Sequence, residues 1–216
     1  MVRAELETAD AVGADDRECE DRDWPDASIG ELCAHIVAVH HDGLREAFPR
    51  IEALLATVVR VHGAEHPELR DLHDAFCQLR TELERHLERE ETVLFPTCRE
   101  LELTGAAIDE ALLAGHEREH ATTGDALGVL RVLAGDYDVG GALCNTHRAL
   151  LEDLAAFERD LHRHVHEENN ILIRRARQLA TDPEAAHRSA DAADSLPRCC
   201  QAWIAEQSRG WAPRRG

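Results

Sequence analysis

The chain has 216 residues, enough for one domain with a sizeable core, and it is rich in Leu, Ala, Val, Glu, Arg and His but only 4% aromatic. This mixture favours α-helices, because alanine and straight-chain residues lose little entropy in a helical turn. A formal net charge of −19 repels a phosphate backbone, so we expect no nucleic-acid partner, and no apolar run is long enough to suggest a membrane partner.

The first helix is predicted to begin after Ser28, because Ser28 and Glu31 form a capping-box pair. It is predicted to run to about His62, where Gly63 ends it. Pro49 lies inside this span, and we expect it to bend the helix.

The second helix is predicted to start at Pro67 and to stop at Pro96. Glycine pairs and turns separate two further helices, expected over about 106–134 and 142–180. Four long helices joined by short loops must run antiparallel to their neighbours around one core. The sequence therefore predicts an all-α fold, an up-and-down four-helix bundle, over residues 24–181.

The two ends of the chain lack this pattern. Residues 1–23 are acidic and polar without periodicity, and we expect a disordered lead-in. Residues 182–216 form a polar, basic tail in which Cys199 and Cys200 are either ordinary thiols or a redox or metal-transfer handle. Seven scattered cysteines and the lack of a secretory signal favour the cytoplasm. Three of these cysteines are expected to be small buried fillers: Cys33, Cys77 and Cys144.

Each predicted helix carries an apolar stripe at spacings of three and four residues, the pattern of an inward face. The stripe begins with Ala34 and Val37 in the first helix and reaches Val93 in the second and Ile171 in the fourth. Ionisable residues interrupt all four stripes. They are His41; His86 and Glu90; His116 and His120; His164 and Glu168.

The second and fourth helices share the pattern His-x-x-x-Glu, which places both side chains on one helix face. Burying a lone carboxylate costs several kcal/mol or shifts its pKa until it is neutral. Two inward carboxylates among several imidazoles therefore require a positive charge between them, which a metal supplies. Counted from one end of the bundle, His41, Glu90, His120 and Glu168 lie at similar depths and can converge.

Neutral imidazole together with carboxylate suits iron, and also manganese or zinc. Two carboxylates that can each bridge suit a pair of ions better than a single ion. The alternative without metal is a set of hydrogen-bonded polar residues in the core of a helical interaction protein.

Two sequence segments carry a family resemblance. Glu90-Glu91-Thr92-Val93-Leu94-Phe95-Pro96 and Glu167-Glu168-Asn169-Asn170-Ile171-Leu172, with the two His-x-x-x-Glu pairs, resemble the hemerythrin-like cation-binding domain. The segment from His35 to Gly63 and the stretch from Arg118 to Gly124 are similar to the repair-of-iron-centres family. Proteins of that family hold two non-haem iron ions and help to restore iron–sulfur clusters damaged by nitric oxide or oxidants.

The resemblance covers about residues 24–180 and implies iron as the cofactor and damaged iron–sulfur proteins as partners. It implies iron ligands at His41, His86, His120 and His164, with Glu90 and Glu168 as bridging carboxylates. Glu119 matches a position near the solvent path to the metals.

Three features differ from the repair family. Only Cys19 precedes the bundle where that family often has a Cys-Cys domain, and Ile173-Arg174 replace a Phe-Pro after the fourth helix motif. His116 stands one turn before His120, an arrangement that resembles oxygen-binding hemerythrins, which use five histidines. His116 is thus either a fifth histidine ligand or a hydrogen-bonded neighbour. The alternative function is reversible binding of O₂ or NO for sensing, storage or detoxification.

Several other histidines fall off the stripes or at helix ends. We expect them to be solvated or to support the ligands rather than to bind metal. They are His35, His40, His62, His162 and His166.

Overall fold

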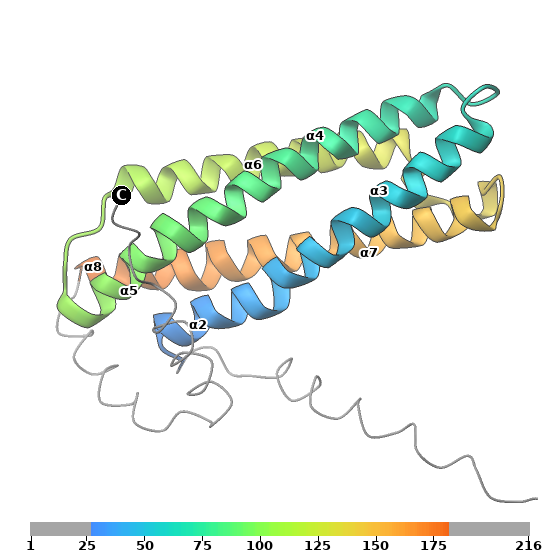
Figure 1. The fold of residues 1–216 in the computed structure, drawn as a ribbon. Helices are drawn as coiled ribbons and strands as arrows, with labels where there is room; N and C mark the ends of the chain where they lie inside the picture. The colour runs from blue at the N-terminus through green and yellow to red at the C-terminus, as the bar shows by residue number, and fades with distance from the viewer. Residues whose placement is uncertain (1–26, 182–216) are drawn as a thin grey trace, which may run out of the picture.

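The computed structural model describes residues 27–181, in which four long helices lie side by side in an antiparallel bundle (Figure 1). The predicted all-α, up-and-down four-helix bundle is confirmed. The first long helix comprises α2 (Ile29–His35), the π-helical turn η2 (Ile36–His41) and α3 (Asp42–His62). The second comprises α4 (Glu68–Arg89), the π-helical turn η3 (Glu90–Leu94) and α5 (Phe95–Thr104). The third is α6 (Glu110–Leu133), and the fourth comprises α7 (Asn145–Glu167), the π-helical turn η6 (Glu168–Ile173) and α8 (Arg174–Thr181). Two 3₁₀ turns, η4 (Gly135–Tyr137) and η5 (Val139–Gly141), connect α6 to α7.

The first long helix begins with the predicted capping box. The Ser28 hydroxyl accepts a hydrogen bond from the Glu31 amide, and the Glu31 carboxylate accepts one from the Ser28 amide at 2.8 Å. Glu102, from α5, adds a long-range cap by accepting from the amides of Ile29 at 2.8 Å and Gly30 at 3.2 Å. These amides have no partner inside the helix, so Glu102 ties the start of the first long helix to the second.

The prediction that the second helix stops at Pro96 is wrong. In η3 the Phe95 amide bonds to the Glu90 carbonyl, five residues back, and Pro96 follows within the first turn of α5. A proline in a first turn needs no amide donor, so the helix continues to Thr104. It ends at Gly105, whose φ of 69° is the left-handed conformation that glycine adopts without strain. Pro49 lies inside α3 without ending it.

The π-helical turns also shift the predicted apolar stripes by one residue. Around the start of η2 the buried residues are Cys33 and Ile36, rather than Ala34 and Val37. In η3 Leu94 is buried, whereas Val93 is 44% exposed. In η6 the buried apolar residues are Leu172 and Ile173, whereas the predicted stripe has Ile171 at this point. A π-helical turn accommodates one extra residue, so a stripe drawn at 3.6 residues per turn goes out of phase beyond it.

The interior contains two separate apolar cores. The first apolar core lies among α3, α4, α6 and α7, and in it the ring of Phe157 contacts the rings of Phe48 and Phe76. The second apolar core lies among α2, α5, the start of α6, α8 and the adjoining turns, and it includes Leu32, Phe95 and Leu113. On every long helix, the ionisable residues that interrupt the stripes fall between these two cores.

A buried acid on α7, Glu158, ties this helix to α6 and to the turn η4, at the end of the bundle where α6 and α7 are joined. Glu158 is 4% exposed, and it accepts hydrogen bonds from the Arg131 guanidinium and, at 2.6 Å, from the Tyr137 hydroxyl. Burial alone would raise the pKa of Glu158, but these two hydrogen bonds outweigh burial and lower it.

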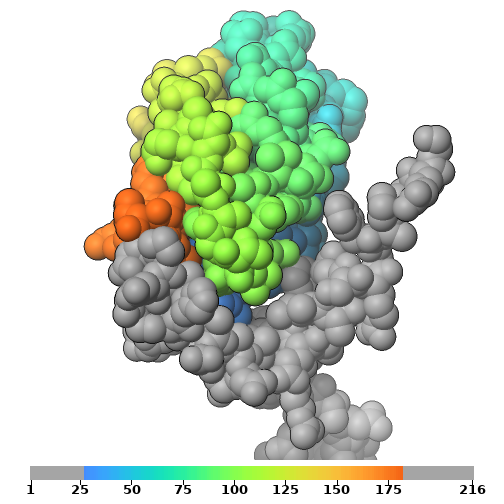
Figure 2. Space-filling view, turned by 90° about the vertical axis from the view of Figure 1, so that its left-hand side faces the viewer, coloured from blue at the N-terminus to red at the C-terminus, as the bar shows by residue number. Residues whose placement is uncertain are grey.

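At the opposite end α8 packs beside α6, as the space-filling view shows (Figure 2). There Arg177 donates hydrogen bonds to the carboxylates of Glu110 and Glu117. None of the helices within residues 27–181 is long and apolar enough to cross a membrane. The predicted lead-in and tail, with Cys19, Cys199 and Cys200, lie outside the described residues.

Candidate metal centre

Seven ionisable side chains meet in the layer between the two apolar cores, and all four long helices contribute to it. Their exposed fractions range from 0 to 7%. We call this set the polar layer, and it consists of His41, His86, Glu90, His116, His120, His164 and Glu168. Every residue predicted from the sequence to bind metal is therefore brought into one layer.

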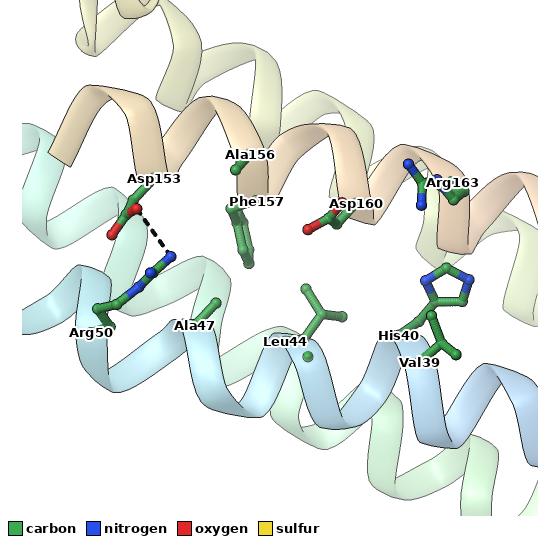
Figure 3. Close-up of a pocket in the computed structure, with 11 residues that line it drawn as sticks. Val39, His40, Leu44, Ala47, Arg50, Asp153, Ala156, Phe157, Asp160 and Arg163 are labelled. Carbon is green, nitrogen blue, oxygen red and sulfur yellow. Dashed lines mark ion pairs between the residues drawn. The ribbon is translucent and has the colours of Figure 1, made fainter. Parts of the chain in front are cut away.

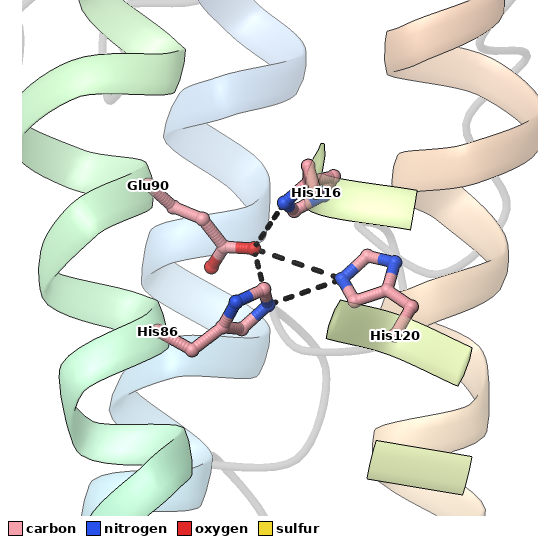
Figure 4. A group of neighbouring side chains, drawn as sticks. All are labelled: His86, Glu90, His116 and His120. Carbon is pink, nitrogen blue, oxygen red and sulfur yellow. Dashed lines mark hydrogen bonds and ion pairs between the residues drawn. The ribbon is translucent and has the colours of Figure 1, made fainter. Parts of the chain in front are cut away.

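One half of the polar layer gathers three imidazoles around one oxygen of Glu90 (Figure 4). The Nε2 of His86 lies 2.8 Å from Oε1 of Glu90, and Nδ1 of His116 and Nε2 of His120 lie 3.4 and 3.7 Å from the same oxygen. Glu168 reaches this half with Oε2, which is 3.1 Å from Nε2 of His120 and 3.4 Å from Nε2 of His116.

The other half contains the remaining two imidazoles and the second oxygen of each carboxylate. The Nε2 of His41 lies 3.2 Å from Oε2 of Glu90, and Nε2 of His164 lies 3.2 Å from Oε1 of Glu168. Each glutamate thus directs one oxygen to the three-histidine half and the other to the two-histidine half. This is the arrangement that a carboxylate needs to bridge two cations.

The donor atoms fit metal ions better than they fit one another. Both carboxylate oxygens of Glu90 and of Glu168 are buried without a good hydrogen bond, as are the Nε2 atoms of His41, His116 and His164. Burying so many polar atoms without compensation is costly, and a cation would satisfy them together. Donors about 2.1 Å from an ion, at tetrahedral or octahedral angles, are about 3.0–3.4 Å apart, close to the spacings given above.

Three of the histidines are oriented by a hydrogen bond at the ring nitrogen that points away from the layer. The pairs are His41 with Glu91 at 2.7 Å, His86 with Glu119 at 2.9 Å and His120 with Asn169 at 2.9 Å. In each pair the Nδ1 atom is engaged, so Nε2 is presented to the interior. Glu119 was expected near the metals, whereas Glu91 and Asn169 were not anticipated. Each directly follows a glutamate of a His-x-x-x-Glu motif, and that shared position is the signal that could have found them.

Protons and metal ions compete for this layer. Burial lowers the pKa of His41, but the neighbouring carboxylates of Glu90 and Glu91 outweigh burial and bring the pKa to about 9. For His120, burial is likewise outweighed by the neighbouring carboxylates of Glu168 and Glu90, and its pKa rises to about 10. Burial and the repulsion of the Glu168 carboxylate raise the pKa of Glu90, yet its imidazole partners hold this pKa well below its usual range. Binding of a cation would therefore release protons from the imidazoles.

Within residues 27–181, the remaining histidines and cysteines lie outside the polar layer. His62 contacts Cys144 at 3.2 Å near the far end of the bundle, and His166 contacts the side chain of Asn170. Cys33 is buried as expected, but Cys77 and Cys144 are half-buried, so their prediction as buried fillers is wrong.

Comparison with known proteins agrees with this geometry. Residues 34–176 match the hemerythrin HHE cation-binding domain. The chain belongs to this family. It is 34% identical over 155 residues to the iron–sulfur cluster repair protein YtfE of Edwardsiella ictaluri, covering 72% of this chain and 69% of that protein. It is 33% identical to the YtfE protein of Dickeya chrysanthemi over the same shares. The iron–sulfur cluster repair protein ScdA of Staphylococcus epidermidis is 27% identical over 68% of this chain and 66% of that protein.

Proposed function

We propose that this chain is a cytoplasmic protein with two non-haem iron ions that takes part in the repair of damaged iron–sulfur clusters. The observation that carries the proposal is the pair of buried carboxylates, Glu90 and Glu168, each with one oxygen in either half of the polar layer. The names of the relatives, which match over most of their length, support iron as the metal and iron–sulfur proteins as the partners.

Each part of the layer has a role in this proposal. The three-histidine half would hold one ion and the two-histidine half the other, with both glutamates shared between them. Glu91, Glu119 and Asn169 keep the imidazoles in the orientation that ligation needs. The two apolar cores exclude water from both sides of the layer. When bound, the iron pair would supply redox chemistry, exchangeable positions for O₂ or NO, and a source of iron.

The test combines metal analysis with a repair assay. Purified protein is expected to contain about two irons per chain, with a Mössbauer spectrum of an antiferromagnetically coupled pair. It is then mixed with a dehydratase whose [4Fe–4S] cluster has been damaged by nitric oxide, and the return of dehydratase activity is followed. A mononuclear zinc site would overturn the proposal.

Two variants sharpen the assay. Glu168→Gln removes a bridging oxygen and is expected to lose both iron and repair, whereas Glu152→Gln, on the exposed surface of α7, is the matched control. Repair no faster than that given by the same amount of free iron(II) would contradict the function even if the iron pair is present.

A second candidate function rests on His116. Its two ring nitrogens lie 3.4 Å from Glu90 and 3.4 Å from Glu168, so a fifth histidine is within the polar layer. Five histidines leave fewer open positions, which favours reversible binding of one O₂ or NO molecule over iron donation. In His116→Ala, loss of the O₂-dependent visible absorption would favour this function. An unchanged spectrum would remove His116 from the ligands.

A further inference from the structure

A second group of metal-binding side chains lies beside the polar layer. It consists of His35 from α2, His40 from η2 and Glu167 from the end of α7. The Oε2 atom of Glu167 is 3.1 Å from Nε2 of His40 and 3.3 Å from Nε2 of His35. The His40 ring stacks on the His164 ring with centroids 5.5 Å apart, so the group adjoins the two-histidine half.

Two of the three members, His40 and Glu167, have unsatisfied donor atoms like those of the polar layer. His40 is 5% exposed and Glu167 is 9% exposed, and neither Nε2 of His40 nor Oε2 of Glu167 makes a good hydrogen bond. All three donors lie within 4.8 Å of one another. Their 3.1 and 3.3 Å spacings suit an ion about 2.1 Å from each donor.

A groove between the first long helix and α7 has one member of this group, His40, in its lining (Figure 3). His40 lies at one end of the groove, and Asp160 and Arg163 line the wall formed by α7. The side chains of His35 and Glu167 are 14% and 12% exposed, so an ion at this position would be closer to solvent than one in the polar layer.

We propose that His35, His40 and Glu167 form a third metal site, which takes a divalent first-row ion such as iron(II). Two imidazoles and one carboxylate with open positions are the ligand set typical of non-haem iron(II). Since Glu167 and His40 directly precede Glu168 and His41, the same two helix segments would present ligands to both sites. In the repair function proposed above, on which this role rests, the third site would bind iron transiently as it moves between solvent and the buried pair.

The site is tested on the full iron-loaded chain with cobalt(II), whose visible absorption reports binding. We expect one further equivalent of cobalt(II) beyond the two irons, and at least a tenfold weaker cobalt affinity in Glu167→Gln and in His35→Gln. His166→Gln, an exposed neighbour on α7, is the control and should bind as the wild type. Iron content near two in each variant shows that the buried pair is intact. The site would be overturned if the wild type binds no further cobalt, or if both variants bind cobalt as tightly as the wild type does.

The role in iron transfer is tested by a separate measurement. Transfer of iron from the loaded protein to an external chelator is expected to be at least fivefold slower in Glu167→Gln than in His166→Gln. Equal release rates would overturn the role while leaving the cobalt result standing. Because cobalt binding needs no damaged partner protein, failure of the repair assay would not be mistaken for failure of the third site.

Discussion

Glu102 offers the most direct test of how the bundle positions the polar layer. Its carboxylate accepts hydrogen bonds from the amides of Ile29 and Gly30, and through them it fixes the start of the helix that carries His41. In Glu102→Ala the Ile29 amide would lose its acceptor in a fully buried position, while water can reach the half-buried Gly30. A hydrogen bond to a charged group contributes about 1.5–3 kcal/mol, and the helix N-terminus adds about 0.3–1 kcal/mol for a nearby anion.

We therefore expect Glu102→Ala to lower the free energy of unfolding by about 2–4 kcal/mol, which is about 5–15 °C in melting temperature for a chain of this length. Glu102→Gln retains an acceptor oxygen and should lose about 1 kcal/mol. The assay is thermal unfolding of the iron-loaded protein followed by circular dichroism. Glu100→Ala, exposed on the same helix, is the control. If Glu102→Ala melts within about 1 °C of that control, the cap does not stabilise the bundle.

Three further outcomes follow from the fold. Chelation of the metal should lower the free energy of unfolding by about 3 kcal/mol or more, because Glu90 and Glu168 lose their shared counter-charge; identical melting curves would contradict this. Leu154→Ala, at a fully buried position of the first apolar core, should cost about 2–5 kcal/mol in urea unfolding yet keep its iron, and loss of iron would show that core and layer are not independent. Because the pKa of Glu158 is lowered in the folded state, its contribution is present above the unfolded value of 4.5 and is lost as the pH falls further. Glu158→Gln should therefore lose less stability than the wild type between about pH 6 and pH 3, and parallel pH curves would refute this.

The polar layer could be predicted because helical spacing is local. The i, i+4 relation of His86 to Glu90 and of His164 to Glu168 holds in any helix, and burial of such pairs is chemically distinctive. What the sequence did not reveal was the phase of the helices beyond the layer. A π-helical turn depends on a shifted backbone hydrogen bond, and no residue type indicates that shift. The sequence pattern therefore places Ala34 and Val37 at the inward positions, which Cys33 and Ile36 occupy.

The same shift explains why the third metal site was missed. His40 was placed off the inward stripe, because consecutive residues of an ideal α-helix point about 100° apart. Within η2, however, both His40 and His41 are buried. The long-range partners were also out of reach of sequence reasoning, since Glu102 and Ile29 are separated by 73 positions.

The division of the interior into two apolar cores has a consequence for turnover of the protein. The second apolar core joins the helix ends where residues 27 and 181 lie, and only the polar layer lies between it and the first. Without a cation in that layer, we expect this end of the bundle to open before the other end, since cooperative units within a protein can open separately. Proteases would then cleave the unwound segments of metal-free molecules, whereas the helices of iron-loaded molecules would stay protected. Lifetime in the cell would thereby become a readout of iron supply.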